Sequence, residues 1–282
     1  MLFRSYRIAR GRKRIRDQTA FLRQSPILLR LLVEDKILKL DFRVLHFDSV
    51  ESTNTAAADQ ARRGADEGLT VVADRQTSGR GRQGRNWSSR KHAGAYFSIV
   101  LRPQLDVRFY SLIPLMAAIA VAEALAKWSI EADIKWPNDI LVDEKKLCGI
   151  LTEMIDTPHG NAVILGVGIN LRDTDPKLNA AALDHLISTG ISRDEVVAAV
   201  HRHLSPLYEE LHADPQAIVN KWSRRSPYAE GLEVTVDLGN GETLIGTTCG
   251  LAENGALRVR MQDGSVYSVQ SGDVHRLRKA AG

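Results

Sequence analysis

An arginine- and glycine-rich segment, residues 76–87, has the composition of a loop that binds anions. It reads Gln-Thr-Ser-Gly-Arg-Gly-Arg-Gln-Gly-Arg-Asn-Trp. Glycines let the backbone pass close to a ligand, and arginines present forked donors to carboxylate or phosphate oxygens. No Gly-Lys-Ser/Thr follows at the spacing of a Walker A loop. The segment therefore predicts a site for an anionic ligand, with a solvated Arg/Gly loop or an RNA-binding segment as alternatives.

Further segments place polar side chains where such a site could use them. Lys-Trp-Pro-Asn-Asp at 135–139 sets a lysine, an amide and a carboxylate around a rigid turn, and Lys146 precedes an apolar strand. A single lysine at such a turn is often only a surface residue. In Gly-Val-Gly-Ile-Asn at 166–170 the small residues permit close approach of a ligand, and Asn170 can pair with a donor/acceptor edge such as that of adenine. A polar strand-to-helix turn is formed by Ser52, Thr53 and Asn54.

Short β-type runs and helical runs should position these segments. Strands are expected at residues 44–47, 69–73, 95–101, 132–135, 140–142, 147–154 and 162–170. Helices are expected at 53–63 after Ser52 as a possible N-cap, at 111–128, at 192–212 with Pro206 as a possible kink, and from Asp214 to about 222. His201, His203 and His212 lack a second ligand cluster and are interpreted as surface residues. The pattern predicts a mixed domain of strands and helices.

The last 50 or so residues have a different pattern. Short β runs at 233–238, 242–251, 256–261 and 266–269 are joined by Asn-Gly at 240–241, Asn-Gly at 254–255 and Asp-Gly at 263–264. These dipeptides are strong hairpin signals because both residues tolerate a positive φ. Consecutive hairpins predict a small SH3-like β-barrel.

The excess of positive charge lies mainly in the first segment of the chain. The 282 residues carry 38 Lys and Arg against 34 Asp and Glu, a net +4, whereas residues 1–43 alone carry +8. Residues 75–91 add six positive charges and no acidic residue. The first segment is interpreted as a solvated basic arm or a reading frame that truly starts near Leu40, with a transit-like peptide as the alternative.

Composition excludes several classes of protein. With 44% hydrophobic and 26% charged residues, the chain is neither disordered nor collagen-like. Cys148 and Cys249 lie far apart without a CxxC pattern, so neither a disulfide framework nor a zinc site is indicated, and a cytoplasmic setting is expected. The longest apolar stretch, 112–126, is interrupted by Glu123 and is too short to span a bilayer, so no membrane partner is expected.

Together these segments resemble the biotin protein ligase family. Ser-Thr-Asn, Gln-x-x-Gly-Arg-Gly-Arg-x-Gly-Arg-x-Trp, Lys-Trp-Pro-Asn-Asp, Lys-Leu-x-Gly-Ile-Leu and Gly-x-Gly-Ile-Asn occur in the family's order, from about Val44 onward. The resemblance implies an α+β fold, namely a mixed-sheet catalytic domain like that of class II synthetases, followed by a small SH3-like β-barrel. It divides the chain into a basic N-terminal extension at 1–41, a biotin- and ATP-binding catalytic domain at 42–230, and the C-terminal domain at 231–282.

The resemblance also implies a two-step reaction. Biotin's carboxylate attacks the α-phosphate of ATP, bound with Mg²⁺, to give biotinyl-5′-AMP, and one lysine of a biotin carboxyl carrier protein then takes the biotinyl group. The implied biotin-binding residues are Ser52, Thr53, Asn54, Gln76, Arg80, Gly81, Arg82 and Lys146. The implied ATP-binding residues are Arg82, Arg85, Trp87 and Asn170. The implied catalytic residues are Arg82, Lys146 and Asp139, the last a partner for Mg²⁺ or the incoming amine, or else a structural support of Lys135; no metal ligand is certain.

The sequence departs from the bifunctional members of the family at its N-terminus. About 40 residues precede the expected domain, and they show no winged helix-turn-helix pattern, so the single-function class is expected and DNA binding is not. A lipoate protein ligase is one alternative, although its Arg-Arg-x-x-Gly-Gly-Gly signature does not occur. A nucleic-acid-binding role for the basic arm is another. Family members often pair through a sheet edge, so a homodimer is possible.

Overall fold

The computed structural model describes residues 39–276 except 173–179, 189 and 240. The greater part of the predicted N-terminal extension, with the alternatives attached to it, lies outside the described residues. Lys39–Gly282 forms one compact unit. No helix of the described part is long and apolar enough to cross a membrane.

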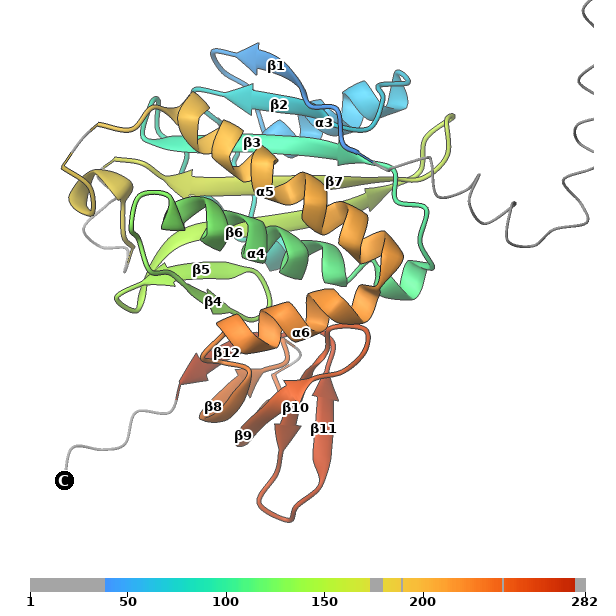
Figure 1. The fold of residues 1–282 in the computed structure, drawn as a ribbon, viewed down its shortest axis with the longest axis vertical. Helices are drawn as coiled ribbons and strands as arrows, with labels where there is room; N and C mark the ends of the chain where they lie inside the picture. The colour runs from blue at the N-terminus through green and yellow to red at the C-terminus, as the bar shows by residue number, and fades with distance from the viewer. Residues whose placement is uncertain (1–38, 173–179, 189, 240, 277–282) are drawn as a thin grey trace, which may run out of the picture. The chain divides into compact units, whose positions relative to one another are not determined.

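A mixed seven-stranded sheet forms the larger part of this unit (Figure 1). Its order is β1-β2-β3-β7-β6-β5-β4, in which β1 and β2 are parallel and every other pair is antiparallel. The strands are β1 Arg43–Phe47, β2 Leu69–Ala73, β3 Gly94–Leu101, β4 Asp133–Lys135, β5 Asp139–Val142, β6 Lys145–Ile155 and β7 Ala162–Asn170. The expected strands are confirmed to within about two residues. The central strands β2, β3 and β7 are mostly buried, as their apolar runs predict.

Helices cover both faces of this sheet. On one face α3 (Thr53–Arg62) packs its small residues Ala57, Ala58 and Ala61 against Val71 and Ile164. On the other face lie α4 (Leu112–Ala126), α5 (Arg193–Ala213) and α6 (Pro215–Arg225), and Figure 1 shows α4 and α5 in front of the strands. Helix α4 is apolar around most of its circumference, because it packs against the sheet, α5 and α6 at once. Short 3₁₀ turns occur at Arg82–Gly84, Val107–Phe109 and Leu183–His185.

The C-terminal part is a five-stranded antiparallel sheet, in the order β11-β10-β9-β8-β12. Its strands are β8 Glu230–Asp237, β9 Thr243–Leu251, β10 Leu257–Arg260, β11 Val266–Val269 and β12 Asp273–Arg276. Gly255 and Gly264 have φ values of +79° and +85°, as the predicted Asn-Gly and Asp-Gly turns require. The apolar side chains of this sheet join the same hydrophobic core as α4 and α6. The consecutive hairpins expected of a small barrel are confirmed.

The sequence singled out Pro206 and His201, which both lie on α5. Helix α5 continues through Pro206 as one helix. The interpretation of His201 as a surface residue is wrong, because the residue is only 8% exposed. Its ring stacks on Phe42 at 3.9 Å, and its Nε2 lies 3.1 Å from Thr70 Oγ1. Burial lowers the pKa of His201 to about 4. The sequence could not show this burial, because Phe42 and Thr70 lie more than 130 residues before His201 in the chain.

Candidate active site

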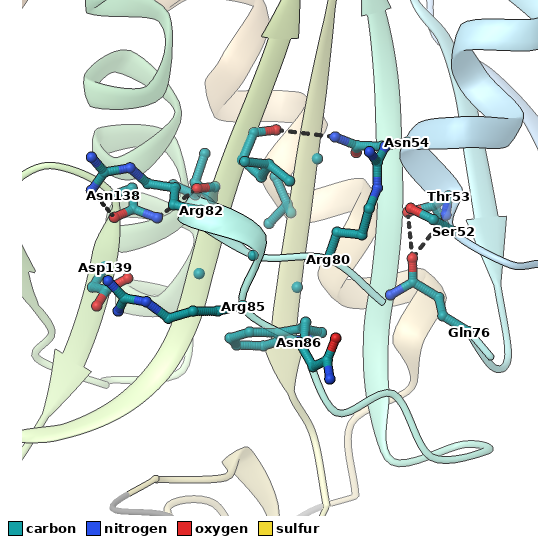
Figure 2. Close-up of a pocket in the computed structure, with 18 of the residues that line it drawn as sticks. Ser52, Thr53, Asn54, Gln76, Arg80, Arg82, Arg85, Asn86, Asn138 and Asp139 are labelled. Atoms are coloured by element: carbon teal, nitrogen blue, oxygen red, sulfur yellow. Dashed lines mark hydrogen bonds between the residues drawn. The ribbon is translucent and has the colours of Figure 1, made fainter. Parts of the chain in front are cut away.

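A cavity of about 130 Å³ opens above β6 and β7, under the arginine- and glycine-rich loop. Figure 2 shows that side chains from the start of α3, from the loop and from β5 converge on it. It is lined by all but one of the residues that the sequence nominated: Ser52, Thr53, Asn54, Gln76, Arg80, Gly81, Arg82, Arg85, Trp87, Asp139 and Lys146. Segments separated by up to 94 positions in the chain therefore meet in one place.

One end of the cavity is a buried polar network at the start of α3. The backbone N–H of Thr53 donates to Gln76 Oε1 at 2.8 Å, and Gln76 Nε2 donates to Ser89 Oγ at 2.7 Å. Ser98 Oγ donates to Asn54 Oδ1 at 2.6 Å and lies 2.7 Å from Thr53 Oγ1. Such a network presents donors and acceptors in fixed directions, which suits a small polar group of a ligand.

Ser52 occupies the N-cap position of α3, as expected, but its side chain makes no capping hydrogen bond. The residue is only 3% exposed and lines the cavity. Its hydroxyl therefore faces the polar end of the cavity instead of closing the helix.

The floor of the cavity is made of glycines. A Cβ at Gly166 would lie 2.1 Å from Asn54 Oδ1, and one at Gly168 would lie 2.6 Å from Trp87 Nε1. On β6, a Cβ at Gly149 would lie 2.9 Å from the Trp87 ring. The indole thus rests directly on the sheet, and its buried N–H finds no hydrogen-bond partner in the described part of the chain. A flat aromatic surface with a spare donor can stack and orient a planar heterocycle.

Three arginines tie the loop to its surroundings. Arg80 donates to Glu153 Oε2 on β6 at 2.8 Å. Arg82 donates to Ser271 Oγ at 2.9 Å and to the Gly272 carbonyl at 3.3 Å, and Arg85 forms an ion pair with Asp273. Burial lowers the pKa of Arg82, which the carboxylate of Asp139 opposes, but a guanidinium remains charged. These contacts anchor the loop to β6 and to the C-terminal part of the chain.

The carboxylate of Asp139 lies among several cations at the other end of the cavity. Asp139 Oδ1 is 2.7 Å from Lys146 Nζ, and this ammonium also lies 5.3 Å from the centre of the Trp87 ring. Burial lowers the pKa of Lys135; Asp139 opposes that shift, whereas Lys146 and Arg85 add to it. The surplus of positive charge suits a ligand carboxylate and phosphates. No group of three or more His, Cys, Asp or Glu among the described residues could hold a metal ion.

The structure adds residues to the predicted set and moves one away from it. Asn170 is not part of the cavity wall; its Nδ2 donates to the carbonyls of Lys146 and Ala181 at 3.3 and 3.1 Å. Asn138, which accepts from Arg82 at 3.4 Å, lies inside the Lys-Trp-Pro-Asn-Asp motif, and Glu153 lies on the strand expected at 147–154. Ser98 carried no signal, because a lone serine on a buried strand is uninformative until its neighbours are known.

Known proteins share both the sequence and the fold of this chain. Residues 46–170 match the biotin/lipoate A/B protein ligase family. The chain is 33% identical over 242 residues to the bifunctional ligase/repressor BirA of Bacillus spizizenii, covering 82% of this chain and 73% of that protein. It is 30% identical over 237 residues to the biotin–acetyl-CoA-carboxylase ligase of Mycobacterium tuberculosis, covering 80% and 86%. The biotin protein ligase from Aquifex aeolicus in complex with biotin and ATP superposes with a TM-score of 0.72 at 28% identity, covering 83% of this chain and 99% of that one.

The chain belongs to the biotin/lipoate A/B protein ligase family. Within that family, the Mycobacterium tuberculosis and Aquifex aeolicus proteins are biotin ligases, so the resemblance inferred from five sequence motifs is confirmed. The mixed-sheet fold followed by a small β domain is confirmed too. The roles of single residues and the boundaries at 41 and 230 stay predictions.

Proposed function

We propose that this protein is a biotin protein ligase. A carboxylate oxygen of biotin attacks the α-phosphorus of MgATP, and the bond to the bridging oxygen breaks to release pyrophosphate. The ε-amine of a lysine on a biotin carboxyl carrier protein then attacks the acyl carbon of biotinyl-5′-AMP, and AMP leaves. An acetyl-CoA carboxylase is the proposed source of the carrier, because the Mycobacterium tuberculosis relative carries that name.

The observation that carries the proposal is the composition of the cavity under the arginine- and glycine-rich loop. Its polar end, at Thr53 and Gln76, suits the ureido group of biotin, and its cationic end suits the carboxylate and the phosphates. Adenylyl transfer requires positioned positive charge more than covalent participation by the protein. Arg82 and Lys146 supply that charge, and Trp87 offers a surface for adenine.

The reactive intermediate explains the loop above the cavity. An acyl adenylate is a mixed anhydride and hydrolyses in water, so a cover that excludes solvent protects it. Arg80, Gly81 and Arg82 belong to that cover. Asn170 is proposed to act on adenine through its Oδ1, because its Nδ2 is already bonded within the protein.

The decisive experiment is mass spectrometry of a biotin-carrier domain incubated with the protein, biotin and MgATP. We expect one lysine of the carrier to gain one biotinyl group, with release of pyrophosphate. The double variant Arg82→Ala, Lys146→Ala should form no pyrophosphate. Its matched control, Arg62→Ala with Lys221→Ala, removes an arginine and a lysine whose ion pairs with Asp59 and Glu210 lie on the surface, and should remain active.

Two outcomes would refute the proposal. Unmodified carrier without pyrophosphate would exclude the ligase, and full activity of the double variant would exclude the assigned site. Thermal stabilisation by lipoate instead of biotin would favour the lipoate-type alternative. A homodimer and a cytoplasmic location, the latter expected from the two free cysteines, remain predictions.

A further inference from the structure

Glu153 forms hydrogen bonds both with the start of α3 and with the arginine- and glycine-rich loop, two segments that lie apart in the sequence. It lies on β6 on the same face as Gly149 and Leu151, which line the cavity, because side chains alternate along a strand. Its Oε2 accepts a hydrogen bond from Asn54 Nδ2 at 2.6 Å and another from Arg80 Nη2 at 2.8 Å. Asn54 and Arg80, both labelled in Figure 2, therefore share one carboxylate oxygen. The side chain of Glu153 is 31% exposed.

This carboxylate extends the buried polar network to the loop. Asn54 Oδ1 accepts a hydrogen bond from Ser98 Oγ, and this contact fixes the orientation of the Asn54 amide. At the far end of the network, Ser89 Oγ donates to the carbonyl of Trp87 at 3.2 Å. The contacts thus run in order through Arg80, Glu153, Asn54, Ser98, Thr53, Gln76, Ser89 and Trp87. The loop is held at both ends by the side chains that form the polar end of the cavity.

We propose that Glu153 is a positioning residue that couples the biotin end of the cavity to closure of the loop. This inference rests on the proposed function. Its carboxylate holds the Arg80 guanidinium, and hence the start of the loop, in register with Asn54. A ligand group bound beside Asn54 and Thr53 stabilises the network and so strengthens the anchor of the loop.

The chemistry of the shared oxygen supports this role. Hydrogen bonds to an ionised acceptor are stronger than neutral ones, and one oxygen serves two donors here. Loss of the carboxylate leaves both donors without that acceptor, and the Asn54 amide loses one of its orienting contacts. Arg82 and Arg85 keep their own acceptors, so only the Arg80 end of the loop is released.

The test compares Glu153→Ala, Glu153→Gln, Arg80→Ala and the double variant Glu153→Ala, Arg80→Ala. Two rates are measured on the full-length protein: tryptic cleavage after the loop arginines without ligand, followed by mass spectrometry, and release of free biotinyl-adenylate after mixing with biotin and MgATP. We expect Glu153→Ala to raise both rates about tenfold, the size of one lost charge-assisted hydrogen bond. Glu153→Gln, which keeps an acceptor oxygen, should rescue part of the effect.

The double variant separates positioning from general destabilisation. If Glu153 acts through Arg80, the double variant behaves like either single variant. Asp59→Asn, which breaks a comparable exposed pair with Arg62 on α3, is the matched control and should match the unsubstituted protein. Melting temperatures identify any variant that is merely unfolded. If Glu153→Ala is unfolded, the loop cleavage and adenylate release of the isosteric Glu153→Gln variant decide between the two outcomes.

The proposal is overturned if Glu153→Ala leaves the rates of loop cleavage and adenylate release unchanged. It is also overturned if the fold-increases caused by Glu153→Ala and Arg80→Ala multiply in the double variant. Failure of the proposed function is distinguishable, because the unsubstituted protein would then release no pyrophosphate. In that case the ligand-free cleavage still decides whether Glu153 anchors the loop.

Discussion

Gly166 and Gly168 allow the two ends of the cavity to be perturbed separately. They lie two residues apart on β7 and so on the same face of the sheet. A methyl group added at Gly166 would collide with Asn54 at 2.1 Å, whereas one at Gly168 would collide with the Trp87 indole at 2.6 Å. We expect Gly166→Ala to weaken biotin binding and Gly168→Ala to weaken ATP binding.

The expected loss of affinity follows from the overlap between each added methyl group and the side chain above it. Carbon contacts are optimal at about 3.5–4 Å, so both added methyl groups require the side chain above them to move. Overpacking of this kind costs about 1–3 kcal/mol. If the displaced side chain is the one that contacts the ligand, the cost appears as lost affinity. At about 1.4 kcal/mol for each factor of ten, the expected loss is roughly five- to 150-fold.

The assay is pyrophosphate release with one substrate varied while the other saturates. Gly166→Ala should raise the KM for biotin and Gly168→Ala the KM for ATP, each with a smaller effect on the other substrate. Gly190→Ala is the control, because its added Cβ meets nothing within 4 Å. The reasoning is refuted if both cavity variants raise the same KM, or if Gly168→Ala leaves the KM for ATP unchanged.

Three further predictions concern the surroundings of the cavity. Asp273→Asn should release Arg85 and raise the KM for ATP several-fold, with biotin affinity unchanged in calorimetry, since the ion pair belongs to the loop and not to the polar end. Asp139→Asn should lower kcat for pyrophosphate formation about tenfold, because Lys146 loses the partner that orients it at 2.7 Å; an unchanged kcat in stopped-flow measurements would contradict this. Because burial depresses the pKa of His201 to about 4, the folded protein favours its neutral ring, so this contribution to stability is complete above about pH 6.5 and is lost as the pH falls toward 4. Denaturant titrations should show a loss of about 3 kcal/mol over that range, which His201→Gln should abolish.

The sequence predicted most of the scaffold, since its signals are local. The strands at 69–73 and 162–170 coincide with β2 and β7, because uninterrupted apolar runs of this length are typical of strands covered on both faces. The hairpins of the C-terminal sheet follow from their Asn-Gly and Asp-Gly turns for the same reason. Most of the site was found because its residues stand in short motifs.

What the sequence did not predict depends on contacts between distant positions. Arg82 donates a hydrogen bond to the carbonyl of Gly272, 190 residues away, and no sequence pattern around either residue predicts this contact. The burial of His201 and the inward bonds of Asn170 likewise depend on which strand lies opposite. Glu153 lies on a predicted strand, but its role as an acceptor for two donors depends on the register of β6 against its neighbours.

The anchoring of the loop by Ser271, Gly272 and Asp273 has a consequence for biosynthesis. These acceptors are translated after every strand of the seven-stranded sheet, and Gly255, whose carbonyl accepts from the indole of Trp136 at 3.0 Å, also follows that sheet. A nascent chain that has completed the seven-stranded sheet therefore lacks the partners of Arg82 and Arg85 until the C-terminal sheet emerges from the ribosome. Retention of a hydrolysable intermediate becomes possible only after both sheets have formed, which delays the chemistry until folding is finished.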